Sequence, residues 1–488
     1  MRQNSNRFTV DGIEFSKLFL FPKILRSVTQ AMHPPRLVIA LLMVAALIAV
    51  GRTWDAFAEP TIHPAGLAAT SWELDREARV QAQTVLRDAI ARYEVSENYF
   101  EGQAELDARE VRRRVARAYQ DQRADLTVAE TSEGPLPGGL LASDRAYIET
   151  MAAIDAVSPK TPFQAVTDEL TGGLAAVVQS VIRLEPGRAV DAARRIFIAS
   201  PITLWRDARL FTIIYGLIAL LVLSIGGGAL CRMAACEIAG QERLRVRQAF
   251  AFAIGNWSRL VLTPVLPLAI AAGIGILMLI PGLFMVAPVL NVIGAVLYGV
   301  AVVLSFLLAL LVLGYLLAAP MLLPAVACEN CDAPDAQLRG YAYLLHKPLH
   351  LVGYGLIAFL GLAIGYWVVS LVGATMLNFS AALARTFSDS SALVGAGGAT
   401  MFDLDPTNPG PIHDSWHASA TAGVVTLWQR IVLDLVAAYV ISYIFSACTM
   451  VYLLMRHACD GQDIEEIWRP GLAPSTLVPL PQTRVIRA

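Results

Sequence analysis

Four of the six cysteines have a spacing that could support chemistry. Cys328 and Cys331 form a C-x-x-C pair, and Cys231 and Cys236 are separated by four residues. Four thiolates brought together at such spacings can bind zinc, and a C-x-x-C pair can cycle between thiol and disulfide. The pattern is weak because no strand–helix–strand context accompanies it. We expect buried thiols at helix ends and neither a metal nor a cofactor, with a thiol- or metal-dependent membrane enzyme as an alternative.

A second set of polar residues follows one stripe of the last apolar run. Arg430 and Asp434 are spaced for an ion pair on a helix, and Tyr439, Ser442 and Ser446 continue the stripe. Ionisable groups within a membrane often mark a transport or proton path. Small polar residues also hold membrane helices together. We favour helix contact, and a transporter or channel is the alternative.

Motifs that specify a reaction are missing from the sequence. It contains no G-x-S-x-G elbow, P-loop, dinucleotide fingerprint or HExxH motif. The formal net charge of −2 provides no basic field for nucleic acid. We therefore predict no catalytic residues and no nucleic-acid partner.

The apolar runs that must position these residues are long enough to cross a bilayer. The chain is 56% hydrophobic and 16% charged, whereas soluble domains carry about 25% charged residues. A membrane helix needs roughly 20 apolar residues, and only closed backbone structures survive in lipid. We predict an all-α polytopic bundle with spans at 36–52, 208–230, 260–280, 297–319, 350–376 and 428–455. Residues 281–296, which include Pro281 and Pro288, fit a loop, a re-entrant turn or part of a longer span.

Lys and Arg near the spans predict the orientation. The first 36 residues hold six Lys or Arg against Asp11 and Glu14, which favours a cytoplasmic N-terminus. Cysteines fall at the predicted cytoplasmic ends of spans, where thiols stay reduced, and this fits a bacterial-type inner membrane. The basic start and Ala56-Phe57-Ala58 also fit a cleavable signal. Alternation then predicts a cytoplasmic segment 1–35 with an interfacial helix, a first span 36–52, an extracytoplasmic domain 53–207, a five-helix bundle 208–456 with an outside loop 377–427, and a cytoplasmic tail 457–488.

The segment between the first two spans is predicted to be an all-helical domain. Apolar spacing gives a helical hairpin over 70–124, then helices near 143–157, 162–185 and 188–199. Thr161-Pro162 and Ser200-Pro201 have the form of an N-cap followed by proline at the first helical position. The second pair predicts a helix that continues unbroken into the second span. The proline-rich tail after Gly471 is expected to be disordered.

Two segments before later spans align without a gap. Each begins aromatic-Ala-aromatic, passes through a short breaker and enters an apolar run. We interpret both as amphipathic helices at the cytoplasmic interface that bend into the membrane, where aromatic side chains are favoured. Their shared direction would make them a parallel duplication. The residues that carry this interpretation are Phe250, Phe252 and Trp257 in one copy, and Tyr341 and Tyr343 in the other.

Three motifs carry a resemblance to known proteins. They are Pro34-Pro35-Arg36-Leu37, Gly226-Gly-Gly-Ala-Leu-Cys-Arg232, and Asp335-Ala-x-x-Arg339-x-Tyr-x-Tyr343. With them the chain resembles uncharacterised planctomycete-type multi-pass membrane proteins and is broadly similar to the Yip1-like and glycerophosphodiesterase-membrane-domain bundles. The resemblance implies a helical membrane domain and no assigned chemistry, because no phosphodiesterase catalytic domain accompanies it.

These observations predict a non-catalytic integral membrane protein. Its bundle would anchor the extracytoplasmic helical domain. The expected partners are the lipid bilayer and a protein that binds the extracytoplasmic domain. Oligomeric state is left open by the sequence.

Overall fold

The computed structural model describes residues 24–60, 62, 72–96, 106–133, 139–183, 185–239, 243–286, 290–387, 393, 397, 399–400 and 416–479. Most of the expected interfacial helix within residues 1–35, and much of the expected outside loop 377–427, lie outside these residues. Two compact units divide the chain. The first unit consists of residues 1–43, 220–362 and 438–488, and the second of residues 44–219 and 363–437.

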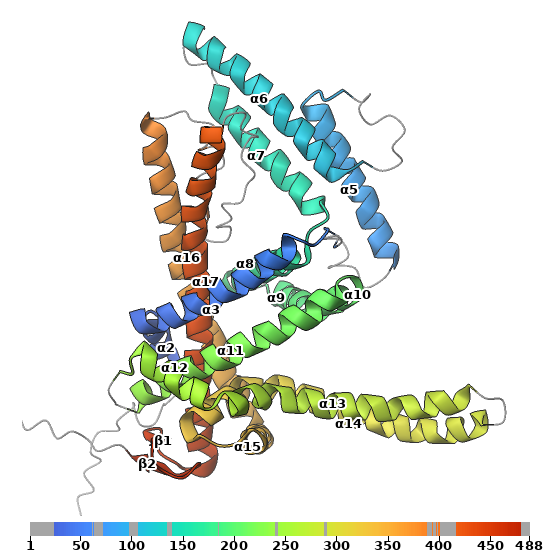
Figure 1. Ribbon diagram of the computed structural model, residues 1–488, viewed down its shortest axis with the longest axis vertical. Helices are drawn as coiled ribbons and strands as arrows, with labels where there is room; N and C mark the ends of the chain where they lie inside the picture. The colour runs from blue at the N-terminus through green and yellow to red at the C-terminus, as the bar shows by residue number, and fades with distance from the viewer. Residues whose placement is uncertain are drawn as a thin grey trace, which may run out of the picture. The chain divides into compact units, whose positions relative to one another are not determined.

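Helices make up nearly all of the described chain (Figure 1). A short two-stranded hairpin, β1 (Glu466–Trp468) with β2 (Leu477–Pro479), follows the last helix. The helices are α2 (Arg26–Ala31), α3 (Pro34–Asp55), α5 (Trp72–Arg92), α6 (Ala108–Glu133), α7 (Gly139–Val157), α8 (Pro162–Ile182), α9 (Pro186–Arg194), the π-helix η3 (Arg195–Ala199), α10 (Ser200–Asp207), α11 (Arg209–Ile238), α12 (Val246–Gly255), α13 (Trp257–Met285), α14 (Asn291–Glu329), α15 (Ala333–His346), α16 (Pro348–Phe387) and α17 (Trp416–Asp460).

Six of these helices are long and apolar enough to cross a membrane. They are α3, α11, α13, α14, α16 and α17. Five of them contain a predicted span, and α11 begins one residue inside the predicted span 208–230. The prediction of an all-α, multi-pass membrane protein is therefore confirmed. Most of the ambiguous stretch 281–296 is helical, because α13 continues to Met285 and α14 begins at Asn291.

Helices α13 and α14 form a long antiparallel hairpin within the first unit (Figure 1). Most of their apolar surface stays uncovered by the rest of the chain. In the second half of α14, the ring of Tyr341 from α15 lies against Gly314. A Cβ at Gly314 would come within 2.5 Å of a ring carbon. The Tyr341 hydroxyl donates to the Leu311 carbonyl at 3.1 Å. Glycine at this position therefore allows α15 to pack closely on α14.

The two aligned segments have the same local structure. Helix α12 ends at a break at Asn256 before α13, and α15 ends at a break at Lys347 before α16. Both break residues leave helical geometry, with φ of −117° and −138°. Asn256 and Lys347 are also equivalent positions in the ungapped alignment. Both segments therefore have the same order of short helix, break and long helix, and their origin by duplication stays a prediction.

In the second unit, α5, α6 and α7 share one hydrophobic core. The predicted hairpin over 70–124 is therefore extended, since α6 continues to Glu133 and α7 adds a third helix. The rings of Tyr119 in α6 and Tyr147 in α7 stack with centroids 3.9 Å apart. The Tyr119 hydroxyl also donates to Asp144.

Alkaline pH is expected to unfold this three-helix core. Burial, with Asp144 adding to it at Tyr119, raises the pKa of Tyr119 and Tyr147 well above the ordinary value of about 10. The folded state thus favours the neutral phenols. Their contribution to stability is complete below about pH 10, where the unfolded phenols ionise, and is lost as the pH rises toward the raised folded-state pKa values.

Tyrosinate absorbance during an alkaline titration of the full chain measures this effect. The phenols of Tyr119 and Tyr147 should ionise only as the core unfolds, above the pH at which exposed tyrosines ionise. The double variant Tyr119→Phe, Tyr147→Phe should lack this late rise in tyrosinate absorbance. Ionisation of both phenols near pH 10 in the folded protein would contradict the expectation.

Asp55, the last residue of α3, caps the start of α8. Thr161 occupies the N-cap position as the sequence suggests, but its own side chain makes no capping bond. Instead, the Asp55 carboxylate accepts from the Thr161 hydroxyl at 2.6 Å and from the backbone N–H groups of Phe163 and Gln164 at 3.0 Å. A carboxylate at a helix N-terminus satisfies donors that the helix itself cannot.

Replacing Asp55 with alanine is expected to release the start of α8 from α3. Loss of a helix cap costs about 1–2 kcal/mol, so hydrogen exchange at residues 161–165 should accelerate roughly tenfold or more. Glu59→Ala is the matched control, because Glu59 is an exposed carboxylate in the same connection. Equal exchange in both variants would show that Asp55 does not hold α8.

Two expectations about element ends are wrong. The helix that starts at Ser200 does not run into the second span, because Ala208 breaks it with φ −141° and ψ 55°. Beyond the break, Phe211 packs edge-on against Trp54 with ring centroids 5.7 Å apart. Hence aromatic packing fixes the start of α11 beside the end of α3. The tail is also ordered from Gly471 to Pro479, since β2 pairs antiparallel with β1.

Candidate functional site

In the first unit, hydrogen bonds and ion pairs gather one end of each of the six apolar helices. The ends are the starts of α3, α13 and α16 and the ends of α11, α14 and α17. Helices that cross a layer alternately up and down bring these particular ends to one side. At this side lie five charged residues, here called the charged network: Arg36, Arg232, Glu237, Glu329 and Arg456.

The centre of the charged network is the pair Glu329 and Arg456. Both side chains have no exposed surface, and the Arg456 Nη1 lies 3.5 Å from the Glu329 Oε1. Glu329 also accepts hydrogen bonds from the Tyr452 hydroxyl and from Arg339. The Arg456 Nη2 donates to the carbonyls of Asp463 and Glu466. Removing one partner of such a buried pair strongly destabilises the folded state, because the remaining charge is left in a low dielectric.

Arg36, at the start of α3, makes a second buried pair. Its guanidinium donates to Glu237 at 2.7 Å and to the Ser446 hydroxyl at 3.0 Å. His33 Nε2 lies 3.2 Å from the other oxygen of Glu237. These contacts join α3 to α11 and α17.

Arg232 attaches the C-terminal hairpin to the helix ends. It donates to the Ala327 carbonyl at 2.9 Å and to the Trp468 carbonyl at 2.8 Å. Its guanidinium lies over the rings of Phe252 and Trp468, at 5.1 and 5.5 Å from the centroids. The Ser475 backbone N–H donates to the Glu329 carbonyl at 2.9 Å. Both hydrogen-bond donation and ring stacking therefore hold residues 461–479 on the network.

The buried charges of this arrangement are all engaged by other groups of the protein. Arg36, Arg232, Glu329 and Arg456 are the buried charged side chains of the described residues, and each has at least one internal partner. No family model, curated protein or solved structure matches the chain. The site must therefore be interpreted from its own geometry, and the resemblance to Yip1-like bundles stays a prediction.

The four candidate thiols lie close to the charged network but do not form a metal centre. Cys231, Cys236, Cys328 and Cys331 are buried and free. Within the described residues, no group of three or more His, Cys, Asp or Glu is placed to hold a metal ion. Burial raises the pKa of the Cys331 thiol to about 12. A thiol that stays protonated at neutral pH is a poor nucleophile.

The polar stripe of the last apolar helix is largely used in helix contacts. The Ser442 hydroxyl donates to the Ala31 carbonyl at 3.0 Å, and Ser446 donates to the Ser442 carbonyl while accepting from Arg36. The Tyr439 hydroxyl is buried and makes no hydrogen bond to the described residues. In the second unit, Asp434 interacts electrostatically with Arg52 of α3 as well as with Arg430.

The aromatic residues of the two aligned segments have different surroundings. Phe252 lies under Arg232, and its counterpart Tyr343 donates to Asp460 and faces the ring of Tyr452. Trp257 is exposed, and Phe250 is half-buried. Position at a membrane interface remains a prediction for all of them.

Sequence reasoning missed the charged network as a site. In the sequence, Arg36 counts only as one of the six basic residues before the first span, and Arg232 as the last residue of a glycine-rich motif. Glu329 lies inside the C-x-x-C pair, and Arg456 marks only the end of the predicted bundle. A signal was present, because alternation of the predicted spans places all four at the same side. Their burial and pairing depend on packing between segments hundreds of residues apart, which spacing does not encode.

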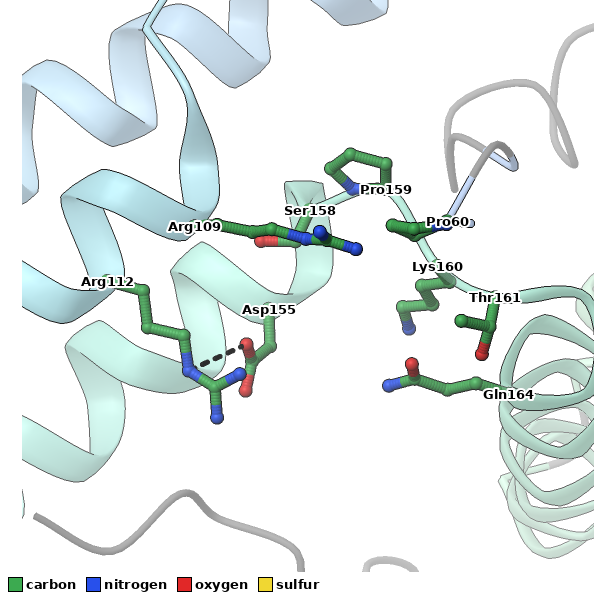
Figure 2. Close-up of a pocket in the computed structure, with 9 residues that line it drawn as sticks. All are labelled: Pro60, Arg109, Arg112, Asp155, Ser158, Pro159, Lys160, Thr161 and Gln164. Atoms are coloured by element: carbon green, nitrogen blue, oxygen red, sulfur yellow. Dashed lines mark ion pairs between the residues drawn. The ribbon is translucent and has the colours of Figure 1, made fainter. Parts of the chain in front are cut away.

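A polar pocket of about 200 Å³ lies in the second unit between α6, α7 and α8. Figure 2 shows Arg109 and Arg112 on one side and Lys160, Thr161 and Gln164 on the other. Between them lie Asp155 of α7 and Ser158, which directly follows α7. Arg112 pairs with Asp155 at 3.6 Å. Lys160 pairs with Asp168 at 2.5 Å. Sequence analysis did not single out this site, because its residues come from three helices and two connections. Pro60 and Pro159 complete the lining of the pocket.

Proposed function

We propose that the protein is a non-catalytic, multi-pass protein of an inner membrane that anchors an extracytoplasmic helical domain and engages lipid. The observation that carries the proposal is the use of buried charge. Arg36, Arg232 and the Glu329–Arg456 pair are engaged in bonds between helices. Charges committed in this way fix a bundle and are poorly suited to moving ions or protons, which requires groups that exchange partners.

Topology supports the placement of the helical domain. The charged network joins the start of α3 to the end of α11 and to the end of α17. The helical domain follows the end of α3 and precedes the start of α11, where Trp54 and Phe211 are in contact. If the six apolar helices each cross once, the domain lies on one side of the membrane and both chain termini lie on the other. The basic N-terminal segment favours the cytoplasm for the termini.

Proteoliposomes distinguish this proposal from a transporter or channel. Purified full-length protein reconstituted in lipid vesicles should pass potassium, chloride and protons no faster than protein-free vesicles. Flux that depends on the protein, and that Asp434→Asn or Tyr439→Phe reduces, would overturn the proposal in favour of a transport path along α17. Unfolding of the protein when a metal chelator is added would instead favour the thiol- or metal-dependent alternative.

A further inference from the structure

The pocket between α6, α7 and α8 has a charge pattern that anchoring alone does not explain. Three cationic side chains, Arg109, Arg112 and Lys160, line it together with one carboxylate, Asp155. The guanidinium of Arg109 extends from α6 toward Pro60 and Lys160 (Figure 2). No hydrogen bond or ion pair engages that guanidinium within the part of the chain that the structure describes. An unpaired guanidinium at a concave polar site is a ready donor for an anion.

We propose that this pocket binds the phosphate group of an anionic phospholipid. The proposal rests on the proposed function, because it names the lipid that the anchored domain engages. Arginine presents several N–H donors in a planar fork that matches phosphate oxygens. Gln164 adds an exposed amide at the same rim. The volume, about 200 Å³, is below the roughly 300–1,000 Å³ of sites for drug-sized ligands, which suits a headgroup.

The place of the pocket in the chain favours a lipid over a free anion. Thr161 lines the pocket and donates to Asp55, the last residue of a helix that is apolar enough to cross the membrane. Trp54, next to Asp55, packs on Phe211 at the start of another such helix. Tryptophan and tyrosine collect where hydrocarbon meets the headgroups. The pocket is therefore built onto the helix ends where phospholipid phosphates lie.

Helices α9 to α10 provide a second observation for a membrane surface. They expose large apolar side chains to the outside of the second unit, which a water-facing domain would tend to bury. The most exposed are Val190, Phe197, Ile202 and Trp205, at 67, 69, 63 and 54%. Arg188 and Arg206 lie along the same segment. Apolar and basic residues combined on short helices are typical of segments that rest on lipid headgroups.

The test measures lipid affinity of the full-length protein in neutral detergent. Water-soluble short-chain phosphatidylglycerol, phosphatidylcholine and inorganic phosphate are each titrated, and binding is followed by the thermal shift of the protein. Phosphatidylglycerol should bind most tightly. Arg109→Ala should weaken its binding about tenfold or more, as expected for loss of a charged hydrogen bond, and Arg109→Glu should abolish it. Arg117→Ala is the matched control, because Arg117 is an exposed arginine on the same helix outside the pocket.

Each other result overturns the proposal. Equal binding of phosphatidylglycerol and phosphatidylcholine would mean that no anionic headgroup is selected. Binding of inorganic phosphate as tight as that of phosphatidylglycerol, with the same dependence on Arg109, would assign the pocket to a free anion. Equal effects of the Arg109 and Arg117 variants would show that the pocket is not the site. None of these outcomes decides whether the protein is a membrane anchor or a transporter, because flux through vesicles tests that separately.

Discussion

Replacing Glu329 with alanine is expected to destabilise the protein by about 3–5 kcal/mol, the range for breaking one partner out of a buried ion pair. The variant leaves the guanidinium of Arg456 without its carboxylate in a site with no exposed surface. It also removes the acceptor of the Tyr452 hydroxyl and of Arg339. The temperature at which the detergent-solubilised protein loses its monodisperse elution peak measures the effect.

Two further variants make this prediction specific. Glu465→Ala removes an exposed carboxylate close in sequence to the network, and should leave the transition unchanged. The pair Glu329→Leu with Arg456→Met should recover much of the lost stability, because apolar side chains can replace a buried ion pair. If Glu329→Ala loses its elution peak at the same temperature as the wild type, the pair does not hold the helix ends together.

The second large effect is expected from Arg232. The change Arg232→Leu removes two hydrogen bonds from a charged donor and the stacking on Phe252 and Trp468. Bonds of this kind contribute about 1.5–3 kcal/mol each before relaxation. The bond to the Trp468 carbonyl and the stacking on Trp468 attach the hairpin, together with the bonds that Arg456 and Ser475 make. We therefore expect residues 461–479 to detach more readily while the apolar helices stay folded.

Limited proteolysis detects that detachment directly. Cleavage between residues 461 and 479 should be at least about tenfold faster in Arg232→Leu than in the wild type. Arg247→Ala, which changes an exposed arginine at the start of α12, provides the control. Unchanged cleavage in Arg232→Leu would show that the hairpin is held by other contacts.

The architecture of the membrane helices was predictable because it rests on local composition. Runs of about 20 apolar residues define helices without reference to their neighbours. The ends of the helices were harder to predict from local composition. The helix from Ser200 stops at Ala208 beside the contact of Phe211 with Trp54, and these two residues are far apart in sequence. Likewise, Asp55 rather than Thr161 caps α8, through bonds across 108 and 109 positions of the chain.

The burial and pairing of charged residues could not be predicted from the sequence. Arg36, Arg232 and Arg456 look like ordinary basic residues at the ends of spans. The partners of Arg36 are Glu237 and Ser446, the partner of Arg456 is Glu329, and Arg232 donates to two backbone carbonyls. All of these contacts depend on which helices are neighbours. The tail was misjudged for a related reason. Its prolines suggested a disordered chain, but Trp468 finds partners on α11 and α12 that the tail alone does not contain.

Topology mapping tests the central claim most directly. Single cysteines at Ala153 in the helical domain and at Glu465 beside the charged network are exposed positions for a membrane-impermeant maleimide. They are introduced after the six native cysteines are replaced by alanine. In intact cells, the cysteine at position 153 should be labelled from outside, and that at position 465 only after the membrane is permeabilised. Labelling of both from the same side, or of position 465 alone from outside, would contradict an anchor that carries its helical domain on the external face.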